Sequence, residues 1–327
     1  MSGASDNSFQ AINYSLRPNK VIARKTIFEF LKKLEGTLDL GSYRYIGMGS
    51  LWFVDFLLVH RLFGIKKLCS IEADDIGYAR ARFNAPLGCI EVKHGYTTDI
   101  LPTLNLDRQK SIVWLDHDTA IDGAARDDIP LLVDECKNGS VILITVNADV
   151  RRVRKVIKPG APDAVTPEEV RGHLAQRLGD IVPVALTEAD IGDDGYGKLI
   201  RRLLEASISA SLRESGRKLQ FLKLFDFTYK DGPPMATVGG LLGDEIAATR
   251  VQAEASILKW RAIISETIQA PPLTLREKMK LDQLLPSKVK LKEATFEKKS
   301  GFPLTQRQIS AYVDYYSLYP TFAELQL

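Results

Sequence analysis

Three consecutive polar residues, Asp116, His117 and Asp118, follow an apolar stretch at 111–115 that is typical of a buried β-strand. Carboxyl ends of parallel strands meet at one edge of an open α/β sheet, where ligands and reactive groups collect. A histidine between two carboxylates can be held in one tautomer and made more basic, which suits removal of a proton from a hydroxyl or an amine. These three residues are therefore predicted to be catalytic. The alternative is that Asp116 contacts a cofactor or caps a turn and His117 is only a surface loop residue.

A second group of candidate residues starts at a glycine turn. Residues 43–46 are β-prone, and Gly47-Met48-Gly49-Ser50 can turn tightly and let a ligand approach the backbone. The next predicted strand, 68–71, ends in Glu72, and an acid about 20 residues past such a turn is where nucleotide-binding α/β folds hold ribose hydroxyls. A dinucleotide fingerprint would need glycine where Trp52 stands. The unit is therefore predicted to bind a nucleoside, and it lacks the dinucleotide fingerprint.

The elements that must position these residues alternate along the chain. Apolar periodicity predicts an α/β, Rossmann-like sheet of five parallel strands and a C-terminal antiparallel hairpin, with helices on both faces. The predicted domains are 1–242 and a helical C-terminal extension, 243–327. Strands are expected at 43–46, 68–71, 89–94, 111–115, 140–146, 219–229 and 236–242, and helices at 21–34, 51–63, 74–83, 121–136, 197–214, 245–268 and 306–316.

The glycine turn, the acid after the second strand and the closing hairpin resemble class I S-adenosylmethionine-dependent methyltransferases, and also bacterial proteins described as "putative O-methyltransferases". The resemblance spans residues 20–242 and departs from the usual motif at Leu51, where a third glycine is common. It implies S-adenosyl-L-methionine as the cofactor and a methyl acceptor that is an oxygen or nitrogen of an unidentified substrate. The cofactor-binding residues it implies are Gly47, Gly49, Ser50, Glu72, Ala73, Thr98, Asp99 and Asp116.

Two of these assignments have alternatives. An acid after the third strand commonly binds the adenine amino group in that family, and Asp99 matches this place, but Thr98 or Asp99 can also cap a short helix. Helices before the first strand often close over the cofactor, so Arg17 and Lys20 could face the site. The alternative for them is two solvated basic residues beside a proline.

Asn147 and Asp149, after the fifth strand, raise the question of a metal. Together with the acids after the fourth strand they resemble the site of catechol-type O-methyltransferases, whose oxygen ligands suit Mg²⁺ or Ca²⁺. The order here is Asn-x-Asp and not the adjacent pair of that family. The prediction therefore includes no metal.

Two other functions remain open. The irregular first motif, with Met48 and Leu51, is compatible with a non-catalytic subunit that binds a nucleoside or scaffolds an assembly. The basic segments 151–158 and 276–299 could bind a small anionic substrate or nucleic acid, or could simply be solvated surfaces. The tyrosine-rich tail could hold a second copy or a partner subunit, or pack a small core of its own.

Bulk composition limits the class of protein to which the chain can belong. The chain has 327 residues, 45% of them hydrophobic, and a net charge of +3, which is too small to indicate nucleic acid by itself. We expect no membrane span, because no apolar run reaches about 18 residues, and no signal peptide, because residues 1–9 are polar. Three scattered cysteines are typical of a reduced, cytoplasmic protein.

Overall fold

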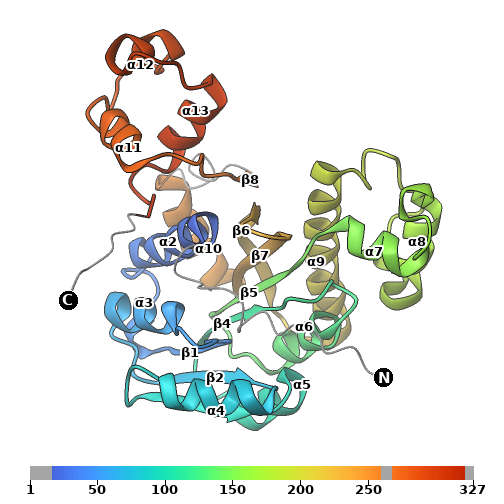
Figure 1. The fold of residues 1–327 in the computed structure, drawn as a ribbon. Coiled ribbons are helices and arrows are strands. Elements are labelled where there is room, and N and C mark those ends of the chain that lie inside the picture. The colour runs from blue at the N-terminus through green and yellow to red at the C-terminus, as the bar shows by residue number, and fades with distance from the viewer. Residues whose placement is uncertain (1–16, 259–266, 321–327) are drawn as a thin grey trace.

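The computed structural model describes residues 17–258 and 267–320, and these form one eight-stranded sheet with helices on both faces (Figure 1). The strand order is β3-β2-β1-β4-β5-β7-β6-β8. The first five strands are parallel, whereas β7 runs antiparallel to both β5 and β6. The predicted five parallel strands and closing hairpin are confirmed. The strands are β1 (Arg44–Gly47), β2 (Leu68–Glu72), β3 (Ile90–His94), β4 (Ser111–Asp116), β5 (Ser140–Asn147), β6 (Gln220–Lys230), β7 (Pro234–Gly243) and β8 (Thr267–Ile268).

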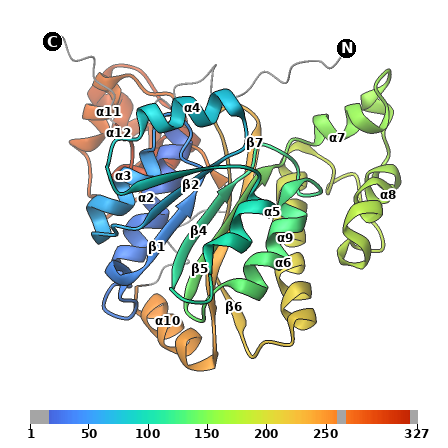
Figure 2. The same cartoon turned by 90° about the horizontal axis from the view of Figure 1, so that it is seen from below.

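The central strands are buried because helices cover both of their faces. Every residue of β5 is buried, as expected for a continuous apolar run inside a parallel sheet. Adjacent residues enter opposite cores: Tyr45 faces one hydrophobic cluster and Ile46 the other. On the first face lie α2 (Pro18–Lys33), α3 (Val54–Phe63), α4 (Asp75–Asn84) and α10 (Glu245–Ile257); on the second lie α5 (Thr97–Ile100), α6 (Ala124–Glu135) and α9 (Asp193–Ser215) (Figure 2).

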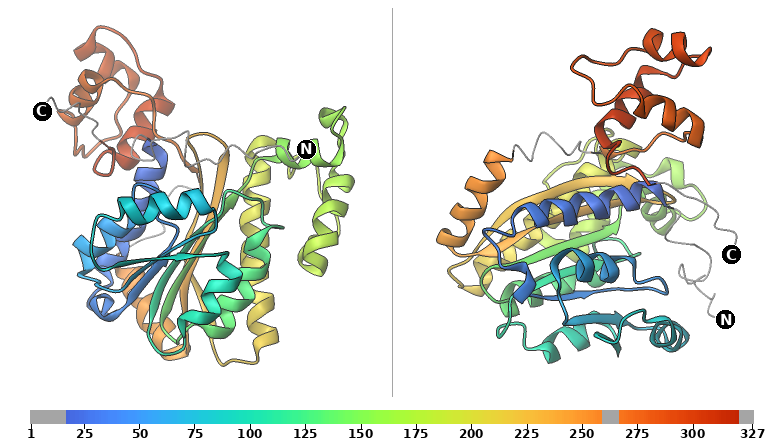
Figure 3. Two further views of the ribbon diagram at one scale, coloured as in Figure 1. Left: turned by 60° about the horizontal axis from the view of Figure 1, so that its bottom comes forward. Right: turned by 90° about the vertical axis from the view of Figure 1, so that its left-hand side faces the viewer.

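Two further helices, α7 (Val150–Ile157) and α8 (Pro167–Leu178), form an arm between β5 and α9 that stands out from the sheet (Figure 3). A capping box at Thr166 starts α8. Its hydroxyl accepts from the Glu169 N–H, while the Glu169 side chain accepts from the Thr166 N–H, and Pro167 occupies the first turn.

The C-terminal helices make a small lobe with its own core. This lobe contains α11 (Leu275–Asp282), α12 (Glu293–Ser300) and α13 (Gln306–Tyr315), and it sits at one end of α2 (Figure 3). Tyr312 is buried in this core, as predicted for the tyrosine-rich tail, but Tyr315 belongs to the main core. The lobe core consists of Leu281, Leu291, Phe296, Leu304, Ile309 and Tyr312.

Two predicted helices differ from the structure. The helix expected at 51–63 begins at Val54, because Ser50 and Phe53 have left-handed backbones (φ 51° and 48°) that interrupt it. The helix expected at 245–268 is wrong beyond Ile257. Residues 267–268 are strand β8 and pair in parallel with β6, while 259–266 lie outside the described residues.

The boundary predicted at residue 242 stays a prediction, although α10 packs on the sheet and β8 extends it. Over 17–258 and 267–320, no helix is both long and apolar enough to cross a membrane. The polar segment 1–9 lies outside the described residues.

Candidate active site

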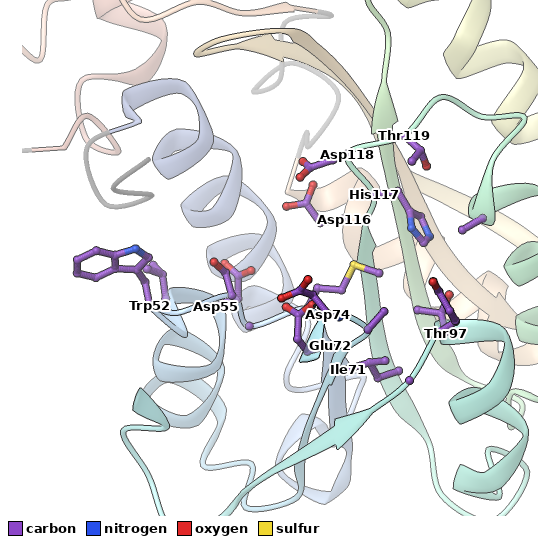
Figure 4. A pocket seen from close by; sticks show the side chains of 18 of the residues that line it. Trp52, Asp55, Ile71, Glu72, Asp74, Thr97, Asp116, His117, Asp118 and Thr119 are labelled. Atoms are coloured by element: carbon purple, nitrogen blue, oxygen red, sulfur yellow. Dashed lines mark hydrogen bonds between the residues drawn. The ribbon is translucent and has the colours of Figure 1, made fainter. Parts of the chain in front are cut away.

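A pocket of about 670 Å³ opens where the carboxyl ends of β1, β2, β3 and β4 meet (Figure 4). Its volume lies in the range of small-molecule and cofactor sites. One wall comes from α2, so segments far apart in the sequence close around the same space. The lining includes residues 48–50, 71–75, 95–97 and 116–119, together with Lys20, Arg24, Trp52, Val54, Asp55 and Ala124.

The loop after β1 is shaped by Gly49. Its N–H donates to Ser70 Oγ at 3.0 Å, and a Cβ at this position would lie 2.6 Å from the Phe53 ring. Glycine is therefore required for the loop to pack on that ring. Ser50 also lines the pocket, and its buried Oγ has no hydrogen-bond partner in the part of the chain that the structure describes. Gly47 does not line the pocket and instead lies against the Tyr45 ring.

Glu72 ends β2 and lines the pocket together with Ala73. Its Oε1 accepts from the Asp74 N–H at 3.1 Å, and Asp74 in turn caps α4 by accepting from the Gly77 N–H at 2.6 Å. Burial raises the pKa of Glu72 above its ordinary value. A carboxylate held in this way at a strand end can accept hydrogen bonds from two neighbouring hydroxyls.

After β3 the residues that reach the pocket are Gly95, Tyr96 and Thr97. Thr98 and Asp99 do not line it, and Asp99 is exposed on α5. Thr97 is 4% exposed and donates from Oγ1 to Asp128 Oδ2 at 2.6 Å. The sequence predicted Thr98 and Asp99 and not Thr97, because it does not fix which residue of this four-residue helix faces the pocket.

Asp116 and Asp118 point to one side of the β4 end and His117 to the other (Figure 4). This follows from the alternation of side chains along an extended chain. The carboxylate that lies against the imidazole is Asp128 of α6: His117 Nε2 is 3.0 Å from Asp128 Oδ2, although the N–H is not directed along a hydrogen bond. The premise that the two flanking aspartates hold His117 is therefore wrong. Asp128 was missed because it lies within helix α6 and not at the end of a strand.

Two ion pairs form the wall under α2. Lys20 Nζ binds Asp116 Oδ2 and Arg24 Nε binds Asp55 Oδ1. Lys20 faces the site, as the resemblance suggested, whereas Arg17 precedes α2 and does not line the pocket. The four charges cancel, so this wall is polar but neutral overall.

Asn147 and Asp149 do not line the pocket. Asp149 caps α7 and pairs with Arg151 at 2.8 Å, and its N–H donates to Asn147 Oδ1 at 2.9 Å. Within the described part of the chain, no three His, Cys, Asp or Glu side chains are grouped so that they could hold a metal ion. The basic segment 151–158 forms most of α7, and Arg152 Nη1 donates to the Asp118 carbonyl at 3.3 Å.

Comparison with known families shows to which family the chain belongs. The model of a family described as "Putative O-methyltransferase" matches residues 12–327. This chain belongs to that family. Membership confirms the resemblance to methyltransferases. No curated protein matches the chain.

Several solved methyltransferase structures share part of the fold. An O-methyltransferase from Bacillus cereus in complex with SAH is 14% identical (TM-score 0.38) over 67% of this chain and 80% of that one. Trm1 from Pyrococcus horikoshii with S-adenosyl-L-methionine is 9% identical (TM-score 0.48) over 72% and 58%. The O-methyltransferase TomG from Streptomyces achromogenes with SAM is 14% identical (TM-score 0.36) over 71% and 92%. These likenesses are too distant to assign residues.

Proposed function

We propose that this methyltransferase transfers a methyl group to a hydroxyl oxygen of a small molecule, and that the reaction takes place in the pocket at the strand ends. The observation that carries the proposal is that one cavity gathers the loop after β1, Glu72, Thr97 and residues 116–118. A binding site for a nucleoside and a set of acids for an acceptor thus share one space of about 670 Å³.

The residues present fit S-adenosylmethionine, which supplies an electrophilic methyl group when bound. Glu72 would accept hydrogen bonds from the ribose hydroxyls, as acids at this strand end do. Ser50 Oγ, buried and unpartnered, would bond to the cofactor beside the Gly49 loop. Thr97 and Gly95 would border the base.

The acceptor hydroxyl would lie between Asp116 and Asp118, which point into the same side of the pocket (Figure 4). Asp116 is paired with Lys20, and Asp118, which is exposed and lines the pocket, is the carboxylate that would take up the proton. As the acceptor oxygen bonds to the methyl carbon, the carbon–sulfur bond breaks with its electron pair left on sulfur. The hydroxyl proton passes to the Asp118 carboxylate and then to water.

His117 would act on the opposite side of the β4 end from Asp116 and Asp118, where the cofactor would bind. Its imidazole is 5% exposed and is held between the pocket and the Asp128 carboxylate, which is 0% exposed. Thr97 bonds to the same carboxylate oxygen. We therefore assign His117 and Asp128 to positioning of the loops after β3 and β4 around the cofactor.

The substrate would also carry an anionic group. Arg151, Arg152, Arg154 and Lys155 line a second pocket of about 380 Å³ beside α7. Arg152 joins this pocket to the active site through its bond to the Asp118 carbonyl. The expected effect of an Arg152→Ala/Lys155→Ala variant is a raised KM for the acceptor with unchanged affinity for SAH.

We further place the enzyme in a bacterial cytoplasm. Its three cysteines, Cys69, Cys89 and Cys136, are all unpaired, which suits a reducing compartment. Fractionation of cells that make the protein would test this.

Ultraviolet cross-linking of methyl-labelled S-adenosylmethionine, followed by trypsin digestion, tests where the cofactor lies. The label should appear in the peptides 45–61, 68–80, 94–108 or 111–126, which hold the pocket residues. Excess unlabelled SAH should remove it. Label that stays in the presence of SAH, or that appears in the tail at 276–299, would contradict the assignment.

A further inference from the structure

The most unusual feature of the pocket is a lysine ammonium bound to the carboxylate at the end of β4. Lys20 is 5% exposed, and its Nζ binds Asp116 Oδ2 although the two residues are 96 positions apart. Both line the same pocket. A buried ion pair is costly to form, so its presence inside a ligand pocket calls for an explanation beyond stability.

The backbone around Lys20 is fixed on three sides. Asp231, in the hairpin between β6 and β7, accepts from the N–H groups of Asn19 (3.1 Å) and Lys20 (2.7 Å). The Asn19 side chain donates to the Lys230 carbonyl at 2.8 Å and accepts from the Ala270 N–H at 2.5 Å. These bonds hold the start of α2 over the pocket, so the ammonium is in place before any ligand arrives.

Asp116 stays ionised in this setting. Burial alone would raise its pKa, but the Lys20 ammonium, helped by Arg24 and His117, holds the pKa below its ordinary value. Its second oxygen, Oδ1, is buried and has no hydrogen-bond partner among the described residues. Because Lys20 and Asp116 both line the pocket, the pair brings a cation to the pocket wall.

A hydroxyl acceptor uses the cation of this pair. Its hydrogen is directed to Asp118, which takes up the proton, while the negative charge that develops on its oxygen needs a nearby positive charge. In enzymes that use a divalent cation, the metal supplies this charge. Here Asp116 is neutralised by Lys20, and Asp149 after β5 is engaged with Arg151, so these acids already have cationic partners in the protein.

We propose that Lys20 is a catalytic residue that contacts the acceptor oxygen and takes the role that a divalent cation plays in metal-dependent O-methyltransferases. The inference rests on the proposed function and deepens it. The Lys20 side chain stabilises the oxygen while the hydroxyl proton moves to Asp118 and the new oxygen–carbon bond forms. Transfer is then independent of added metal.

The test follows label from methyl-labelled S-adenosylmethionine into a small-molecule extract of the cells that make the protein. Wild type should label a product equally well with EDTA and with added Mg²⁺. Lys20→Met should lower the rate by about 100-fold, the scale seen when one transition-state donor is removed. Lys20→Arg, which keeps a cation, should recover part of it.

Lys20→Met leaves Asp116 buried without its partner, which can destabilise the fold. A second variant controls for this effect. Lys20→Met/Asp116→Asn removes both charges and should still bind SAH like wild type while remaining about 100-fold slow. Lys33→Met, an exposed lysine on the same helix, is the matched control and should behave as wild type.

The outcomes separate the two claims. No label from wild type, together with no SAH binding, contradicts the proposed function itself. Label that disappears with EDTA and returns with Mg²⁺, or a folded Lys20→Met/Asp116→Asn variant of full activity, overturns the role of Lys20 and leaves the proposed function standing.

Discussion

At the scale of single residues, Gly49 ties loop shape to cofactor binding. Its N–H is held by Ser70 Oγ, and the Phe53 ring fills the space where a side chain would begin. Gly49→Ala should therefore cost about 1–3 kcal/mol of unfolding free energy, because the overpacked loop must shift. Chemical denaturation would measure this, with Gly36→Ala as the control, since no heavy atom lies within 4 Å of a Cβ there. Equal stability of Gly49→Ala and wild type would contradict the account of the loop.

The opposite directions of His117 and Asp118 lead to separable effects. His117→Asn should weaken SAH binding several-fold, because the imidazole between the pocket and Asp128 is lost. Asp118→Asn should leave SAH binding intact and lower kcat by about 100-fold, as removal of a positioned base does. Calorimetry and the label-transfer assay measure the two quantities. A lowered kcat with normal SAH affinity in His117→Asn would return the histidine to the role of base.

The rule that reactive groups collect at strand ends accounts for how much of the site could be predicted. Glu72, Asp116 and His117 follow strands whose apolar runs are plain in the sequence, and all three line the pocket. Asp128 could not be found in this way, because it sits in a helix and meets His117 only through tertiary packing. Thr97 was missed by one position, because sequence patterns do not locate the start of a helix to a single residue.

At the scale of elements, α2 is the part that turns a sheet edge into a closed pocket. Its first turn has no side-chain cap of its own, and Asp231 of the hairpin supplies the acceptor instead. Asp231→Ala should therefore lower the free energy of unfolding by about 1–2 kcal/mol, the usual value for a lost cap. The variant should also make the backbone position of Lys20 over the pocket less fixed.

Urea denaturation of Asp231→Ala, with exposed Asp134→Ala as a control expected to change by less than about 0.5 kcal/mol, measures this effect. If both variants unfold alike, the hairpin does not hold the helix. Because the capping residue Asp231 lies 211 positions from Lys20, the local sequence gives no sign of it. The sequence therefore predicts a helix here but not what fixes its start.

Strand β8 was missed for a related reason. Two residues, Thr267 and Ile268, give no periodicity, and pairing with Thr228 and Tyr229 of β6 decides their conformation. The preceding apolar helix pattern was therefore extended too far. The long elements were predicted because their burial leaves a pattern in the sequence: a continuous apolar run for β5, and a helical period on one face for α9.

At the scale of the whole molecule, α13 links two cores. Tyr315 packs in the main core and Tyr312 in the core of the C-terminal lobe, where its hydroxyl donates to Asp282 at 2.6 Å. Tyr312→Phe removes this bond to a carboxylate and should lower the unfolding free energy by about 1–2 kcal/mol. Tyr316→Phe, directly after α13 and half-buried, is the control. An unchanged unfolding midpoint in Tyr312→Phe would show that the hydroxyl does not stabilise the lobe.

The overall architecture was predictable because five parallel strands, a hairpin and a helical tail each have their own pattern. The arrangement of the tail relative to the sheet was not, because it depends on which tyrosine enters which core.

The central claim, that Glu72 binds the cofactor ribose in this pocket, leads to a definite pH dependence. Ribose hydroxyls donate to the ionised carboxylate, so protonation of Glu72 weakens binding. Burial raises the pKa of Glu72, and affinity for SAH should therefore begin to fall at a higher pH than for an ordinary glutamate as the solution is acidified.

Calorimetric titration of SAH into wild type, Glu72→Ala and the exposed control Glu297→Ala tests this claim most directly. We expect wild type and Glu297→Ala to bind alike, and Glu72→Ala to bind at least about tenfold more weakly, which corresponds to about 1.4 kcal/mol. The loss of affinity on acidification should be absent in Glu72→Ala. Equal binding by Glu72→Ala and wild type would place the cofactor elsewhere and contradict the account.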